Sequence, residues 1–130
     1  MLTVKIEENY EPILREMGVL KTDGICVMAM RDKDLLMGIG IMRMFDDFAS
    51  LDSIIMKDEF KCFELEFGMG KSMLNVIDLR GIRNVVTNID NERLTTALRF
   101  KSAKENEALV EFSGDWSYHL NLEGYFTSNC

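Results

Sequence analysis

The sequence has few of the residues on which metal, disulfide and nucleophile sites depend. It contains one histidine, His119, and three cysteines, Cys26, Cys62 and Cys130, which are widely spaced and fall in no paired motif. An odd, scattered set of cysteines argues against both a disulfide framework and a zinc site. A lone histidine has no partner for a catalytic dyad. We therefore expect no metal centre, and we interpret His119 as a structural or an exposed residue of a strand.

Long apolar runs are also absent. A transmembrane helix needs about 20 consecutive apolar residues, whereas the apolar runs of this chain are only a few residues long. Met1 to Glu8 carry acids where a signal peptide needs a basic lead and an apolar core. We expect a cytoplasmic protein without a membrane partner. With 47% hydrophobic residues and one proline, the chain is expected to fold as a single domain over residues 1–130.

Basic residues are also few compared with acidic ones: 15 lysines and arginines against 22 aspartates and glutamates give a formal net charge of −7. Nucleic-acid binding depends on lysines and arginines that neutralise phosphates, so no nucleic-acid partner is expected. Seven acids and only two lysines lie between residues 46 and 66, the acids being Asp46, Asp47, Asp52, Asp58, Glu59, Glu64 and Glu66. This stretch has two interpretations: a solvated acidic face, or a rim that attracts a cationic, amine-bearing substrate.

The first half of the chain predicts a short helix and an antiparallel meander. Asn9 is a candidate cap for a helix that has Pro12 in its first turn and ends at Gly18. Three apolar runs separated by polar turns then predict strands at 25–30, 35–45 and 49–56. Gly38 and Gly40 in the second strand indicate a bulge or a low surface across which another element lies, unless they reflect plain irregularity.

The second half predicts alternating helices and strands. The apolar spacing from Lys71 to Leu79 is typical of a helix, with Gly81 as its C-terminal cap. A strand over 82–88, a helix capped by Asp90 or Asn91, and strands at 109–112 and 118–126 follow, the last two joined by a hairpin turn at 113–115. The expected fold class is α+β, a three-layer arrangement in which helices flank a central, mostly antiparallel mixed sheet.

The stretch from Phe67 to Leu74 is the strongest candidate for a ligand site. Gly68 and Gly70 predict a glycine-rich turn that feeds a helix, where backbone N–H groups and the helix dipole attract a phosphate. Residues 60, 63, 67, 70, 74 and 77 also share one helical stripe, and a continuous helix would abolish this cradle. Two interior glycines oppose that alternative by about 2 kcal/mol, which favours a break near Gly68.

This order of elements resembles the GNAT superfamily of acyl-CoA-dependent N-acetyltransferases. The anchors of the resemblance are the segments 36–40, 68–74 and 91–94. The resemblance implies acetyl-CoA as the acyl donor, with its pyrophosphate on the loop amides and its pantetheine arm beside the central strand. The implied coenzyme-binding residues are Ile55, Met56, Gly68, Met69, Gly70, Lys71, Ser72 and Asn91, with Ile54 beside them.

The chain departs from the family pattern around this loop. The position three residues before the first glycine, usually Arg or Gln, is Leu65. Glu64 and Glu66 are expected to lie near a ligand with several negative charges. The tyrosine that many members place on the last helix corresponds to Thr95 or Leu98.

Acyl transfer to an amine needs a base for the ammonium group and an acid for the departing thiolate. Asp58 and Glu59, directly after the central strand, are the candidate bases, and Tyr125 or Tyr118 is the candidate acid. The predicted acceptor is a small-molecule or peptide amine. The alternative function is a catalytically inactive GNAT-fold module that binds a ligand or forms a homodimer.

Overall fold

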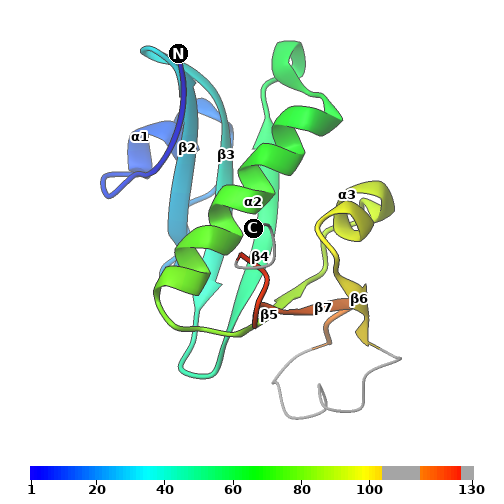
Figure 1. The fold of residues 1–130 in the computed structure, drawn as a ribbon. Helices are drawn as coiled ribbons and strands as arrows, with labels where there is room; N and C mark the ends of the chain where they lie inside the picture. Colours follow the sequence, from blue (N-terminus) through cyan, green and yellow to red (C-terminus); the bar gives the residue numbers. More distant parts are fainter. Residues whose placement is uncertain (104–114, 127–130) are drawn as a thin grey trace.

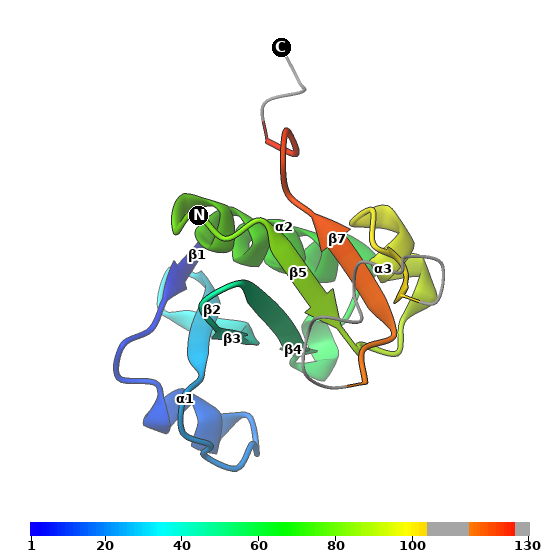
Figure 2. The same ribbon diagram turned by 90° about the horizontal axis from the view of Figure 1, so that it is seen from below.

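The computed structural model describes residues 1–103 and 115–126, which form a seven-stranded sheet in the order β1-β2-β3-β4-β5-β7-β6. Helices α2 and α3 cover one face of this sheet and α1 lies on the other (Figures 1 and 2). The elements are β1 (Leu2–Ile6), α1 (Glu11–Glu16), β2 (Cys26–Asp32), β3 (Leu35–Met44), β4 (Phe48–Met56), a 3-10 turn (Asp58–Phe60), α2 (Phe63–Leu79), β5 (Asn84–Thr87), α3 (Glu92–Ala97), β6 (Lys101–Ser102) and β7 (Tyr118–Asn121). The predicted α+β class with a mostly antiparallel mixed sheet is confirmed.

Strands β2, β3 and β4 form the predicted meander, and β1 adds a fourth strand at its edge. β2, β3 and β4 pair antiparallel in sequence order, as the apolar runs indicated. β1, which the sequence did not predict, pairs antiparallel with β2, Val4 lying opposite Met30. Leu2, Val4 and Ile6 alternate with Thr3 and Lys5, which is a strand pattern that the prediction missed. The first helix begins after Tyr10, so the predicted cap at Asn9 is wrong.

The predicted break at Gly68 is wrong, because α2 runs without interruption from Phe63 to Leu79. Gly68 and Gly70 therefore lie inside a helix and form no turn. Four α2 side chains are fully buried against the sheet and α3, namely Met69, Met73, Leu74 and Ile77. Each contributes about 1.5–3 kcal/mol of hydrophobic stabilisation, so the four together contribute roughly 6–12 kcal/mol. This exceeds the cost of about 2 kcal/mol for two interior glycines.

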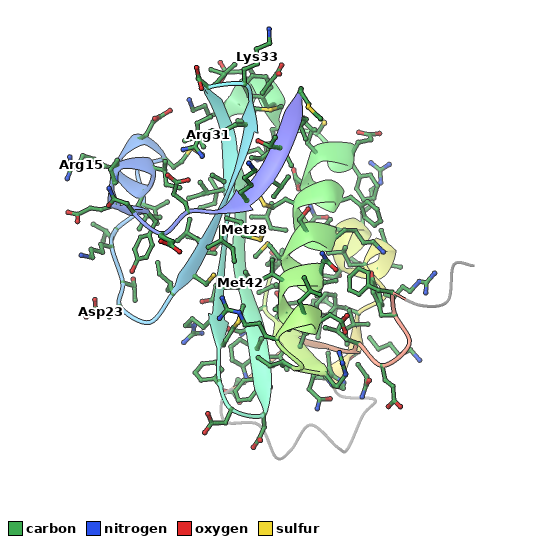
Figure 3. All side chains as sticks on the ribbon, turned by 60° about the vertical axis from the view of Figure 1, so that its left-hand side comes forward. Arg15, Asp23, Met28, Arg31, Lys33 and Met42 are labelled. Atoms are coloured by element: carbon green, nitrogen blue, oxygen red, sulfur yellow. The ribbon has the colours of Figure 1, made fainter. Side chains whose placement is uncertain are left out.

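Two glycines allow α2 to approach its neighbours closely. A Cβ atom at Gly40 of β3 would lie 2.6 Å from the sulfur of Met73, and one at Gly70 would lie 2.7 Å from Cδ1 of Leu98. Met28 and Met42 belong to the same buried cluster and extend from β2 and β3 beneath α2 (Figure 3). The prediction of a low surface crossed by another element is confirmed at Gly40.

The remaining elements differ from prediction mainly in length. The predicted cap at Asn91 is confirmed, because its Oδ1 accepts a hydrogen bond from Leu94 N at 3.1 Å. β7 ends at Asn121 rather than at Phe126, since the chain turns at Gly124, whose φ is +72°. The predicted strand at 109–112, and the part of the predicted turn at 113–114, lie outside the described residues. Among residues 1–103 and 115–126, no helix is long and apolar enough to cross a membrane.

The two helical glycines give a matched test of the packing. No atom lies within 4 Å of a Cβ at Gly68, so Gly68→Ala should raise the free energy of unfolding by about 1 kcal/mol through helix propensity. At Gly70 the new methyl group meets Leu98, and overpacking costs about 1–3 kcal/mol. Gly70→Ala should therefore give no gain or a loss in urea unfolding. Equal gains from both variants would contradict the close α2–α3 contact.

Burial of His119 predicts a pH dependence of stability. The side chain is 6% exposed in β7, its Nε2 lies 3.1 Å from Asn84 Oδ1, and burial lowers its pKa below the ordinary value. The unfolded chain takes up a proton near pH 6.5, whereas the folded chain does so only at lower pH. The free energy of unfolding should therefore fall as the pH drops below about 6.5. Urea titrations of His119→Gln should show a weaker fall; an identical fall would contradict this assignment.

Candidate active site

β4 and β5 run parallel at first and then separate. They pair only from Phe48–Leu51 to Asn84–Thr87, after which β5 ends and β4 continues to Met56 (Figure 1). The hydroxyl of Thr87 donates to Leu51 O at 2.7 Å and accepts from Ile89 N at 3.1 Å. The Thr87 side chain thus adds a hydrogen bond at the last residue pair of the two strands, Leu51 and Thr87, and stabilises the turn by which the chain leaves β4. Among the described residues, no strand therefore pairs with this edge of the second half of β4.

A β-bulge lies at the point of separation. The β3–β4 register shifts between Ile41 and Met42, so that Asp52 has no opposite residue. Arg43 holds this carboxylate in a two-point ion pair, with 2.7 Å from Nε to Oδ2 and 3.2 Å from Nη2 to Oδ1. The hydroxyl of Ser50 also donates to it, at 2.8 Å. The bulge bends β4, and the charge of Asp52 is compensated, so this acid is not part of an open acidic rim.

A pocket of about 340 Å³ lies beside the open part of β4. Its walls come from the end of β4, the start of α2 and the segment that leads from β5 into α3; the lining residues are Ile54, Ile55, Met56, Lys61, Glu66, Ile89, Asp90, Asn91 and Leu94. Of the predicted coenzyme-binding residues, Ile55, Met56 and Asn91 meet here. The pocket thus combines apolar strand residues with polar groups from two helix starts.

The predicted pyrophosphate loop does not reach this pocket. Gly68, Met69, Gly70, Lys71 and Ser72 lie within α2 and do not line it. Met69 and Gly70 are buried, and Ser72 donates its hydroxyl to Gly68 O at 2.9 Å within the helix. Since α2 begins at Phe63, the segment that precedes the helix is 57–62 and contains no glycine. Assignment of residues 68–72 as a cradle is therefore wrong.

Lys71 instead contacts aromatic rings along the outer side of α2. Its ammonium lies 4.4 Å from the ring centre of Tyr125 and 5.3 Å from that of Phe126. Phe67, one turn earlier, lies 6.0 Å from the same ammonium. Such cation–π contacts stabilise a structure by about 0.5–1 kcal/mol at exposed sites. They give Lys71 a packing role that attaches the C-terminal segment to α2.

The side chain of Asn91 joins the two helices at the pocket. While its Oδ1 caps α3, its Nδ2 donates to Glu66 Oε2 at 3.3 Å. The sequence indicated Asn91 as a site residue and Glu66 as an acid near the ligand, but the bond between them was missed because residues 66 and 91 share no local signal. The stripe formed by Phe63 and Phe67, which indicates an earlier helix start, was the one available sign that Glu66 lies in the first turn.

The three predicted catalytic residues do not form one site. Asp58 and Glu59 are exposed in the 3-10 turn that follows β4 and do not line the pocket. Tyr125 is buried, and its hydroxyl donates to Leu98 O at 3.0 Å. Burial raises the pKa of Tyr125, and the nearby Arg99 partly offsets this effect. Tyr125 lines a different cavity, of about 400 Å³, beside β7. In the described part of the chain, no group of three potential metal ligands occurs.

No family model and no curated protein matches the sequence. Solved structures do match the fold. SpeG of Vibrio cholerae, a spermidine/spermine N-acetyltransferase, aligns with a TM-score of 0.74 and 11% identity over 100% of both chains. The ribosomal-protein-S18-alanine N-acetyltransferase of Escherichia coli gives 0.63 and 13% over 79% of each chain.

A GNAT family acetyltransferase from Elizabethkingia anophelis, solved with acetyl-CoA bound, aligns with a TM-score of 0.59 and 9% identity. The alignment covers 92% of this chain and 94% of the other. At such low identity these likenesses concern the arrangement of the backbone. The chain has the fold of the GNAT acetyltransferases.

Proposed function

We propose that this protein is an N-acyltransferase that transfers an acyl group from acetyl-CoA to a primary amine. The observation that carries the proposal is the pocket beside the second half of β4, past the end of β5, where none of the described strands pairs with this edge of β4. The likeness to GNAT structures, one of them with acetyl-CoA bound, supports it.

The residues of the pocket fit the pantetheine arm of the donor. Alternate residues along an open strand edge present N–H and C=O groups, which pair with extended amide-bearing ligands as an added strand would. Ile54 and Met56 supply apolar contacts on one side, and Leu94 supplies them on the other. The fit to the phosphates is poorer. The first turn of α2 offers backbone N–H groups, but it also carries Glu64 and Glu66.

When bound, the thioester supplies an acyl carbon to which the amine forms a C–N bond as the C–S bond breaks. An ammonium with a pKa of about 10 must first lose a proton. Asp58 and Glu59 lie in the 3-10 turn between Met56 and Lys61, two residues that line the pocket, and we assign them the role of accepting this proton through water. Tyr125 hydrogen-bonds Leu98 outside the pocket, so the thiolate takes its proton from solvent.

A second candidate function is a GNAT-fold module that binds a ligand without turnover. It is favoured by the first turn of α2, which has no glycine and two glutamates where a phosphate-binding turn needs close backbone approach and positive charge. Both candidate functions use the same pocket to bind a ligand. They differ in whether the protein then transfers the acyl group.

Thermal unfolding with and without acetyl-CoA tests the shared site. Acetyl-CoA at about 100 times its dissociation constant should stabilise the protein by about 2.7 kcal/mol. Ile54→Trp places a bulky ring in the pocket and should abolish the shift. Ile82→Trp is the matched control, because Ile82 is also half-buried but does not line the pocket. No shift at millimolar acetyl-CoA, or an equal shift in Ile54→Trp, would overturn the assignment of the pocket.

Release of free thiol then separates enzyme from module. The amine panel includes spermidine and a peptide with an N-terminal alanine, because two proteins of similar fold are named for these acceptors. We expect thiol release with at least one primary amine. Binding of acetyl-CoA without release with any of these amines would favour the module.

A further inference from the structure

The rim of the pocket, meaning the lining residues Lys61, Glu66 and Asp90 together with the chain segments that contain them, has more acids than bases. Six acids and three bases lie in the segments 57–66 and 90–93, which surround the start of α2 and the start of α3; the acids are Asp58, Glu59, Glu64, Glu66, Asp90 and Glu92. Of the three bases, Lys57 bonds Glu16 at 2.5 Å, and Arg93 lies over the Phe63 ring at 4.0 Å from its centroid. Lys61 is the base that lines the pocket itself.

Glu66 is the member of this set with a fixed place in the pocket. It lies in the first turn of α2 and lines the pocket, and its Oε2 accepts the hydrogen bond from Asn91 Nδ2. Glu66 is the fourth residue of α2, so it belongs to the same first turn as the N–H groups that have no partner within the helix. An anion that approached those N–H groups would meet this charge at short range, where repulsion between like charges is least screened by solvent and salt.

We propose that Glu66 is a specificity-determining residue that selects the donor by charge. The inference rests on the proposed function. The pocket takes the acyl-pantetheine arm, which carries no charge, and gains little affinity from the three phosphate groups that coenzyme A adds to it. Binding therefore depends on the strand edge and the apolar contacts of β4, and the phosphates extend into a region that repels them.

Calorimetric titration with two thioesters tests this assignment. The wild-type protein should bind acetyl-CoA and S-acetylpantetheine with dissociation constants within about ten-fold of each other. Glu66→Gln keeps the acceptor for Asn91 and removes the charge. It should lower the dissociation constant for acetyl-CoA about three- to ten-fold at low salt and leave that for S-acetylpantetheine unchanged. Glu8→Gln changes the net charge equally at an exposed position far along the chain from the pocket and should affect neither.

A salt titration of the wild-type protein gives a second measurement that needs no variant. If the rim repels phosphate, the affinity for acetyl-CoA should stay constant or increase as the ionic strength rises from about 0.05 M to about 0.5 M, because salt screens the repulsion. A steep loss of acetyl-CoA affinity with salt would overturn the inference. So would an unchanged affinity for acetyl-CoA in Glu66→Gln, or an equal change for both thioesters. If the wild-type protein binds neither thioester, the proposed function itself fails.

Discussion

The close approach of α2 to the sheet and to α3 determines the rest of the structure. Gly40 lets the methionines of α2 lie directly on β3, and Gly70 lets Leu98 of α3 press against α2. With α2 in this position, the crossover from β4 returns the chain to lie parallel to β4 along its first half. The pocket exists because β5 then stops at Thr87 and leads into α3, while β4 continues.

The position of α2 also decides which residues meet the pocket. Because the helix begins at Phe63, its first turn presents Glu66, and the glycines lie a turn further along, facing α3 and solvent. The glycine pair therefore contributes to helix packing. The glycines that resemble a phosphate-binding loop in the sequence are thus part of a packed helix. The first turn of α2 carries Glu64 and Glu66, which repel a phosphate.

Much of the fold could be predicted from local patterns. The apolar runs of the meander, the cap at Asn91 and the low surface at Gly40 each have a signal within a few residues. Ile55 and Met56, which line the pocket, were named only through the family resemblance. The start of α2 was predicted wrongly although Phe63 and Phe67 share the helical stripe, because the choice between a helix and a break at Gly68 depends on the burial of Met69, Met73 and Leu74 against distant elements. The hydrogen bond of Glu66 could not be predicted, because its partner is 25 residues away. The Arg43–Asp52 pair at the bulge also has no local signal.

The bond between Asn91 and Glu66 has a consequence for how the protein responds to a ligand. α3 has only six residues, too few to be stable without its cap and its packing. The same amide that is oriented by Glu66 also presents the oxygen that caps this helix. A ligand that displaces Glu66 loosens the cap, and one that replaces Glu66 as partner tightens it. The order of α3, observable by hydrogen exchange at its first amides, thereby reports what occupies the pocket.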